Sequence, residues 1–384
     1  PQNPLMTGKQ LRRFIINNKV DCALLLGNGI NRYAQTGCSW ETLLKALAKA
    51  YCPKLSFDSL PNGISNTEFF DILEIAVMKE IPTFDKNKLL AQDVKLANAL
   101  PKEILERISK EIQEYTTKPL KPINLKDDYK LKRQFVESNS MVDMEMAMTF
   151  STLGDKFSVA LRSKLVASIC SLIQKWSFAP IHKGVSSFAL KYQIPILTTN
   201  YDNLLAQSID AELHNLEHDS FSETFPISSC FTKTENPDFN KFGIWHINGM
   251  IQYPKSILIG LSHYMRSLDK IRELLLPQNE YDAELFQGNC LGFNSLKQTW
   301  LNLIFSRHLF IIGLSLDRDE ILIRWLLLER AKYFSLYPNC AKKGYYIISE
   351  TEHIDEGKKY FLNNIGFEIV RLPSYDAIYK LISA

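Results

Sequence analysis

The most informative stretch of the sequence is CALLLGNGINR, residues 22–32, which runs from five apolar residues into a Gly-Asn-Gly turn. An apolar run of this length, closed by glycine, is typical of a parallel strand that is buried on both faces. Two glycines around one residue let the backbone turn tightly and approach other groups closely. Arg32 occupies the position of the third glycine of a complete dinucleotide-binding fingerprint. Taken alone, the turn fits a structural role as well as a binding role.

Further strands are expected along the rest of the chain, at residues 194–197, 309–312, 344–349 and 367–372. The last two alternate with helical stretches at 351–363 and 375–383, and Gly366 is placed to end the first of these helices in a left-handed conformation. Strand and helix in alternation predict a parallel sheet with right-handed crossovers. The expected fold class is therefore α/β, with a Rossmann-like parallel sheet.

A long middle segment, residues 51–191, has helical periodicity and few strand signals. Prolines interrupt it, so several helices are expected in it rather than one long helix. We predict a helical insertion domain at 51–191. It divides the Rossmann-like core into a first part, residues 1–50, and a remainder, residues 192–384.

Composition excludes several classes of protein. The chain has 384 residues, of which 46% are hydrophobic and 23% charged, which is typical of a soluble globular protein rather than a disordered one. No apolar run is long enough to cross a membrane and no signal peptide is visible, so we expect a cytoplasmic protein. The 45 basic and 42 acidic residues give a net charge of +3, which does not indicate a nucleic-acid partner.

The cysteines argue against a structural metal. Seven cysteines are scattered along the chain without a CxxC pair, so neither a zinc ribbon nor a disulfide framework is expected. A reducing compartment and a site without metal fit this pattern best.

Polar residues follow the predicted strand 194–197 in the order Thr198, Thr199, Asn200, Tyr201, Asp202. Open α/β sheets bind ligands at this carboxyl edge. The amide of Asn200 is suited to holding a ribose hydroxyl or a water, and Asp202 could orient Asn200 or accept from a peptide N–H. A simple turn that caps the next helix explains these residues equally well.

Two later segments have the same character. GIWHINGMI, residues 243–251, reads as a short strand that breaks at Gly249, and FIIGLSLDRD, residues 310–319, places Gly313 and Ser315 just after a strand. Asp317 is a candidate N-cap for the helix that follows.

These four segments, in this order, resemble the SIR2 family, and most closely its bacterial SIR2-like branch of antiphage defence rather than the protein deacetylases. The resemblance covers residues 24–44, 194–205, 243–264 and 309–330. It implies an NAD⁺ site and an NAD⁺ glycohydrolase, which cleaves the bond between nicotinamide and ribose without a metal. The lack of the zinc ribbon found in deacetylases favours hydrolysis over deacylation.

The resemblance also implies roles for individual residues. The pyrophosphate would lie along the loop formed by Gly27, Asn28, Gly29, Ile30 and Asn31. The nicotinamide ribose would face Thr198, Thr199, Asn200 and Asp202. The adenosine half would be covered by Gly313 and Ser315. An unrestrained NAD⁺ hydrolase would be toxic, so its activity is expected to be gated by homo-oligomer assembly or by a companion defence protein, with the insertion as a candidate contact.

One position departs from the family pattern. The family has histidine directly before glycine in the third segment, where this chain has Asn248, and His246 stands two residues earlier. Asparagine cannot take up a proton as imidazole does. Three interpretations stay open: an inactivated variant, which we favour, a natural branch that works without this base, or an enzyme that uses His246. The alternative function is a non-catalytic NAD- or nucleotide-sensing or scaffold subunit.

Overall fold

The computed structural model describes residues 7–80, 162–216, 221–234, 241–275 and 298–383, apart from residues 56, 59, 61, 62 and 319. Residues 1–73 and 163–384 form one compact unit, and residues 74–162 form a second. Both boundaries fall inside the range 51–191. Most of that range lies outside the described residues, so the helical insertion stays a prediction.

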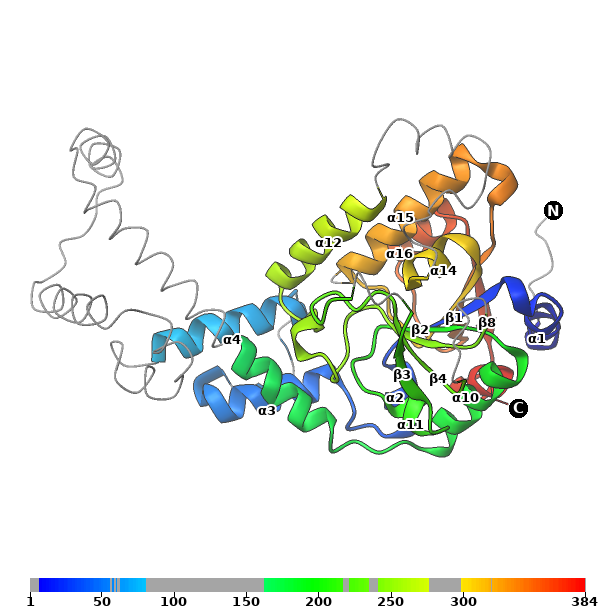
Figure 1. Ribbon diagram of the computed structural model, residues 1–384. Coiled ribbons are helices and arrows are strands. Elements are labelled where there is room, and N and C mark those ends of the chain that lie inside the picture. Colours follow the sequence, from blue (N-terminus) through cyan, green and yellow to red (C-terminus); the bar gives the residue numbers. More distant parts are fainter. Residues whose placement is uncertain are drawn as a thin grey trace, which may run out of the picture. The chain divides into compact units, whose positions relative to one another are not determined.

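The compact unit is built on a sheet of eight strands in the order β3-β4-β5-β2-β1-β6-β7-β8 (Figure 1). The strands are β1 (Cys22–Leu26), β2 (Ile196–Thr198), β3 (Glu212–Asn215), β4 (Ser229–Thr232), β5 (Ile244–His246), β6 (His308–Ile312), β7 (Gly344–Ser349) and β8 (Phe367–Leu372). Neighbouring strands are parallel from β5 through to β8. The predicted Rossmann-like α/β fold is confirmed.

One edge of the sheet differs from the prediction, because β4 runs antiparallel to both β3 and β5. In the described residues no crossover helix separates β3, β4 and β5. Parallel strands need such a crossover, whereas antiparallel strands are joined by a simple reversal of the chain. The sheet is therefore mixed at this edge and parallel elsewhere.

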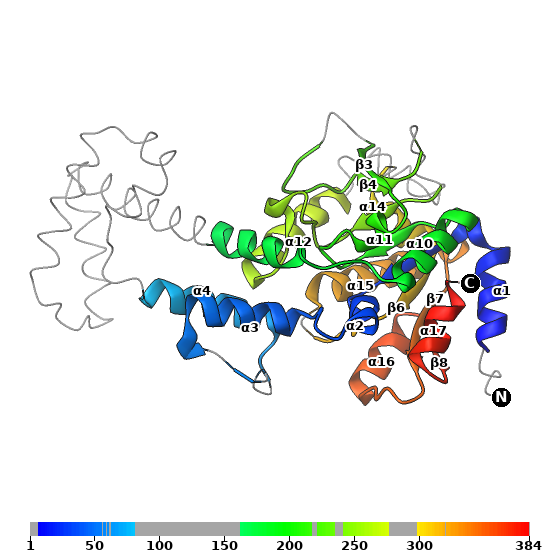
Figure 2. The ribbon, with the colours of Figure 1, turned by 90° about the horizontal axis from the view of Figure 1, so that it is seen from below.

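Helices cover both faces of the sheet (Figures 1 and 2). Along β1, Ala23 and Leu25 pack into one apolar core, while Leu24 and Leu26 pack into the other. The first core is completed by α12 (Leu261–Leu275), α14 (Trp300–Ser306), α15 (Ile321–Leu336) and α16 (Glu356–Asn364). The second is completed by α1 (Gly8–Asn17), α10 (Pro180–Tyr192), α11 (Leu204–Gln207) and α17 (Tyr375–Leu381). A strand buried on both faces explains the unbroken apolar run of residues 22–26.

The described residues form further helices besides those named above. They are α2 (Gly29–Ala34), α3 (Trp40–Tyr51), α4 (Asn66–Glu80) and the short 3₁₀ helices Lys19–Asp21, Pro53–Leu55, Pro254–Ser256 and Pro338–Cys340. Residues 162–173 are also helical. None of the described helices combines the length and the apolar character that a membrane crossing requires.

Local signals for helix ends are partly confirmed. Gly366 has a φ of +79° and follows Ile365, the C-cap of α16, as predicted for the glycine that ends a helix. Asp317, in contrast, does not cap α15. The N-cap of that helix is Glu320, and the carboxylate of Asp317 instead forms an ion pair of 2.6 Å with Lys358.

Most cysteines of the described residues form no disulfide bond. The free and buried cysteines are Cys22, Cys38, Cys52, Cys170 and Cys230. Cys340 is disulfide-bonded, a bond that the sequence pattern did not predict.

A fully buried arginine ties several elements together. Arg330 of α15 is 1% exposed and donates to the main-chain carbonyls of Ile304, Arg307, Lys342 and Lys343. These carbonyls belong to α14, to the residue before β6 and to the two residues before β7. Burial lowers the pKa of Arg330 to about 9. The guanidinium thus supplies donors to the carbonyls of the buried residues Ile304 and Arg307 and joins them to the segment before β7.

We predict that Arg330→Met lowers the free energy of unfolding by at least about 2 kcal/mol, because the buried carbonyls of Ile304 and Arg307 lose their guanidinium donor. Urea unfolding followed by circular dichroism measures the change. Arg13→Met on the exposed side of α1 is the matched control and should leave the midpoint almost unchanged. Equal midpoints for the two variants would contradict this role of Arg330.

Candidate functional site

The four segments singled out in the sequence meet at the carboxyl edge of the sheet. Strand β1 lies between β2 and β6, so the loops after these three strands are neighbours, and the loop after β5 follows next to β2. Main-chain hydrogen bonds join them: Gly27 N–H donates to Ile312 (3.0 Å), and Thr199 N–H donates to Leu26 (3.1 Å). The direction of strand addition reverses beside β1, and doubly wound sheets bind ligands at such a switch point.

Packing between two loops explains the glycines after β1. A Cβ on Gly29 would lie 2.5 Å from the Cα of Gly313, and one on Gly27 would overlap the same loop. The N–H of Gly29 donates to the carbonyl of Gly313 (2.7 Å), and Gly313 has a φ of +64°. The backbone of Gly313 thus fills the space that a side chain at residue 29 would need. The role of this loop in holding a pyrophosphate stays a prediction.

A buried amide connects the first two segments. Asn31 is 1% exposed, and its Nδ2 donates to Asp202 Oδ2 (2.7 Å) and to Asn28 Oδ1 (2.8 Å). The amide of Asn28 in turn donates to the carbonyl of Cys38 (3.0 Å). The side chains of the loops after β1 and β2 therefore form one hydrogen-bonded group.

Asp202 has a local partner as well. Its Oδ1 accepts from the peptide N–H of Leu204 (3.1 Å) at the start of α11. Burial raises the pKa of this carboxyl, while its hydrogen bonds to Asn31 and to peptide N–H groups oppose the rise. Of the two roles considered for Asp202, the structure shows acceptance from a peptide N–H and no hydrogen bond to Asn200.

Three acceptor atoms at this edge are buried and have no hydrogen-bond partner in the described part of the chain. They are Asn200 Oδ1, His246 Nε2 and Asn248 Oδ1, on side chains that are 4%, 2% and 4% exposed. Each such atom costs about 1–3 kcal/mol unless a donor reaches it. A group of unpaired acceptors is therefore suited to a ligand that brings hydroxyl or amide donors.

The orientation of His246 follows from its other nitrogen. Nδ1 lies 2.7 Å from the carbonyl of Asn200, which only accepts, so Nδ1 carries the proton and Nε2 is a bare acceptor. Burial lowers the pKa of His246 to about 4. A group with this pKa holds a proton weakly at neutral pH, which makes His246 a poor general base and a good fixed acceptor.

Asn248 is held by its main chain. Its carbonyl accepts from Leu258 N–H (2.9 Å), and the next residue, Gly249, has a φ of +91° and no room for a Cβ against Ser256. The chain therefore turns immediately after Asn248. The main-chain bond and the turn fix the point from which the amide extends.

The other predicted residues have more local roles. Thr198 Oγ1 donates to Leu26 and accepts from Asn200 N–H, Thr199 is buried, and Ile30 packs into the second apolar core. Ser315 is exposed after β6. The described residues hold no group of three or more His, Cys, Asp or Glu side chains that is placed to bind a metal ion.

Sequence reasoning missed His182 of α10. It is 1% exposed, and its Nε2 lies 3.0 Å from Asn31 Oδ1. The two residues are 151 positions apart, and a single histidine in a helix gives no local signal of such a contact.

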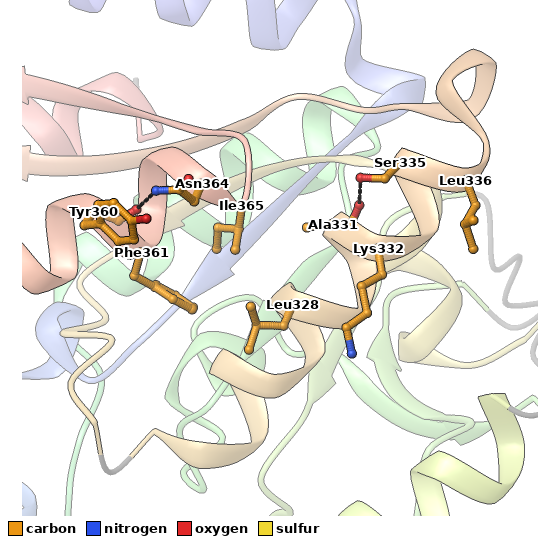
Figure 3. A pocket seen from close by; sticks show the side chains of 9 residues that line it. All are labelled: Leu328, Ala331, Lys332, Ser335, Leu336, Tyr360, Phe361, Asn364 and Ile365. Atoms are coloured by element: carbon orange, nitrogen blue, oxygen red, sulfur yellow. Dashed lines mark hydrogen bonds between the residues drawn. The ribbon is translucent and has the colours of Figure 1, made fainter.

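A groove of about 730 Å³ lies elsewhere, between α15 and α16 (Figure 3). Its lining is mostly apolar and includes Leu328, Leu336, Tyr360 and Phe361. None of the predicted site residues lines it, so it belongs to a different surface from the carboxyl edge.

The comparison with protein families agrees with this geometry. Residues 195–370 match the family description of a SIR2-like domain. These residues therefore have a SIR2-like fold. The match includes three of the four segments and begins after β1, which nevertheless lies in the middle of the same sheet. SIR2-like domains are in general NAD-dependent enzymes, which indicates an NAD-related function. No curated protein matches the chain.

We predict that Gly29→Ala destabilises the protein by about 1–3 kcal/mol, because the new Cβ meets the backbone of Gly313. Gly37→Ala is the control, since a Cβ there has no atom within 4 Å. Thermal unfolding of both variants tests the contact between the two loops. If both variants unfold at the same temperature as the unsubstituted protein, the two loops are not packed as described.

A second prediction concerns pH. The pKa of His246 is about 4 in the folded chain, against an ordinary histidine value of 6.5, so the unfolded chain takes up a proton first as pH falls. The contribution of the neutral His246 ring to the free energy of unfolding is complete above about pH 6.5. It is lost as the pH falls toward 4, and the loss amounts to about 3 kcal/mol. Urea unfolding, measured at several values between about pH 7 and pH 4.5, should show a smaller decline in the free energy of unfolding for His246→Gln than for the unsubstituted protein. The exposed control His353→Gln should match the parent. An unchanged decline in His246→Gln would argue against a buried neutral imidazole.

Proposed function

We propose that this chain binds NAD⁺ at the carboxyl edge of its sheet and hydrolyses the bond between nicotinamide and ribose, giving nicotinamide and ADP-ribose. The unpaired acceptors of Asn200, His246 and Asn248 are the observation that carries the proposal. A ribose brings hydroxyl donors that fit such acceptors. The SIR2-like domain supplies the NAD-related context.

Hydrolysis asks for electrostatic support more than for a strong nucleophile. Nicotinamide leaves as a neutral molecule, and positive charge develops on the ribose as in other glycosyl transfers. The amide of Asn200 is anchored through Nδ2 to the carbonyl of Gly27 (3.4 Å), so its Oδ1 is free to orient a ribose hydroxyl or the attacking water. Asp202 supports the loop through Asn31.

The proton of the attacking water needs an acceptor, and neither Asn248 nor His246 is a good general base. Asn248 offers an oxygen that orients a donor but cannot hold a proton. His246 is a poor substitute because burial lowers its pKa to about 4. Loss of a general base costs about 10²–10⁴ in rate, so slow turnover with retained binding is expected. Among the three interpretations of position 248, an impaired enzyme fits these observations best.

In a cell we propose that an active form acts as a gated effector of antiphage defence that depletes NAD⁺ in the cytoplasm. Gating protects the cell, and it would come from a homo-oligomer or a companion protein. The insertion predicted at 51–191 is the candidate contact, on the ground of its size alone.

A non-catalytic NAD-sensing or scaffold subunit is the alternative. Asn248 favours it, because a buried acceptor without a proton-accepting partner suits binding better than turnover. The alternative shares the site and differs only in the fate of the ligand.

We predict that Asn248→His raises NAD⁺ hydrolysis by about 10²–10⁴ without a large change in NAD⁺ affinity. Nicotinamide release measures the rate, and calorimetry measures the affinity. Because activity is expected to be gated, NAD⁺ is also measured in cells that produce each variant.

Two controls accompany this variant. Asn248→Ala removes the acceptor without adding a base and should not gain activity. Asn200→Ala in the Asn248→His background should lose the gain. Binding without cleavage in every variant would favour the sensor, and absence of NAD⁺ binding would refute both functions.

A further inference from the structure

His182 lies at a junction between three elements. It sits near the start of α10, and its ring reaches Asn31 of α2, whose amide contacts Asp202 in the loop after β2. Both His182 and Asn31 are 1% exposed, so these hydrogen bonds do not compete with solvent.

The donor and acceptor atoms of this junction are fixed by elementary chemistry. The peptide N–H of Ala179 donates to His182 Nδ1 (2.9 Å), so Nδ1 carries no proton. Burial lowers the pKa of His182 to about 4, and the ring is therefore neutral at about pH 7 with its proton on Nε2. Nε2 then donates to Asn31 Oδ1 (3.0 Å).

This donation decides which way the amide of Asn31 faces. With Oδ1 turned to His182, Nδ2 faces Asp202 Oδ2 and Asn28 Oδ1 and donates to both. A rotated amide would present its oxygen to the Asp202 carboxylate, and two acceptors in contact repel each other. The imidazole thus holds the one orientation of Asn31 that supports both loops.

We infer that His182 is a positioning residue of the nucleotide site, which acts through Asn31 to set the Asp202 carboxylate and the Asn28 amide. Its effect on a nucleotide rests on the NAD⁺ binding proposed above. The groups that face the Asp202 carboxylate are Asn31 from α2, the Cys38 thiol from the segment before α3 and the peptide N–H groups of Leu204 and of Asp202 itself. None of these is a cation, so Asn31 is the main side-chain donor for this carboxylate.

Two substitutions separate positioning from simple capping of α10. In His182→Asn, Oδ1 replaces Nδ1 and still accepts from Ala179 N–H, but no donor reaches Asn31. In His182→Gln, Nε2 stands near the lost imidazole Nε2 and still donates to Asn31, while the acceptor for Ala179 is lost. The variants therefore remove one hydrogen bond each, on opposite sides of the same ring.

We expect His182→Asn to weaken NAD⁺ binding on the order of tenfold and His182→Gln to restore most of the affinity. Calorimetry measures both, and thermal unfolding shows that each variant is folded at the assay temperature. If His182 only caps the helix, His182→Asn keeps its affinity and His182→Gln is the less stable variant. That result would overturn the inference.

A second readout does not need NAD⁺. Carboxyl carbons of ¹³C-labelled aspartate are titrated by NMR, and the Asp202 signal is assigned by its loss in Asp202→Asn. In His182→Asn nothing holds the amide of Asn31 with its Nδ2 toward Asp202, so the charged carboxylate loses a hydrogen bond. The titration midpoint of Asp202 should therefore move to higher pH in His182→Asn and stay in place in His182→Gln. Unmoved midpoints in both variants would refute the positioning role. Failure of the parent to bind NAD⁺ while the midpoint moves would refute the proposed function and leave the effect of His182 on Asp202 standing.

Discussion

The candidate site depends on one close backbone contact, in which the loop after β1 lies directly against the loop after β6. The N–H of Gly29 donates to Gly313, a Cβ on Gly29 would meet the Gly313 backbone, and Gly313 has a φ of +64° that favours glycine. Asn28 and Asn31 stand beside Gly29, so their positions follow from this contact. A larger residue at Gly29 would push the two loops apart and disturb the hydrogen bonds that join the loop after β1 to Asp202.

Hydrogen bonding divides the carboxyl edge into two parts. Around Asn31 the buried polar groups are satisfied, with donors and acceptors matched from Ala179 through His182 to Asp202. At Asn200 and Asn248 buried oxygens lack partners in the described residues. Satisfied networks are rigid, whereas unpaired acceptors cost free energy unless a ligand supplies donors. In the proposed function the first part is the support, and the second is the surface that would face the ligand.

The SIR2-like fold of residues 195–370 and the chemistry at position 248 favour different conclusions about activity. The domain indicates NAD-related function, and the acceptors fit a ribose. Proton transfer, however, needs a group whose pKa lies near neutrality, and neither the amide of Asn248 nor the buried His246 provides one. The proposed binding and the proposed turnover therefore rest on different properties of these residues. The family match alone does not distinguish them, because it reports the fold that carries the site rather than the base within it.

The sequence by itself determined the features that neighbouring residues encode. The limits of β1, β7 and β8, the left-handed Gly366 and the order of the polar loops all follow from local periodicity and backbone preference. Only the tertiary structure decided that β4 runs antiparallel, that Asp317 pairs with Lys358 rather than capping a helix, and that Gly29 is packed against Gly313. It also decided the partnership of His182 and Asn31, 151 positions apart. Such contacts arise when the whole chain packs, and no short stretch of sequence contains the information that selects them.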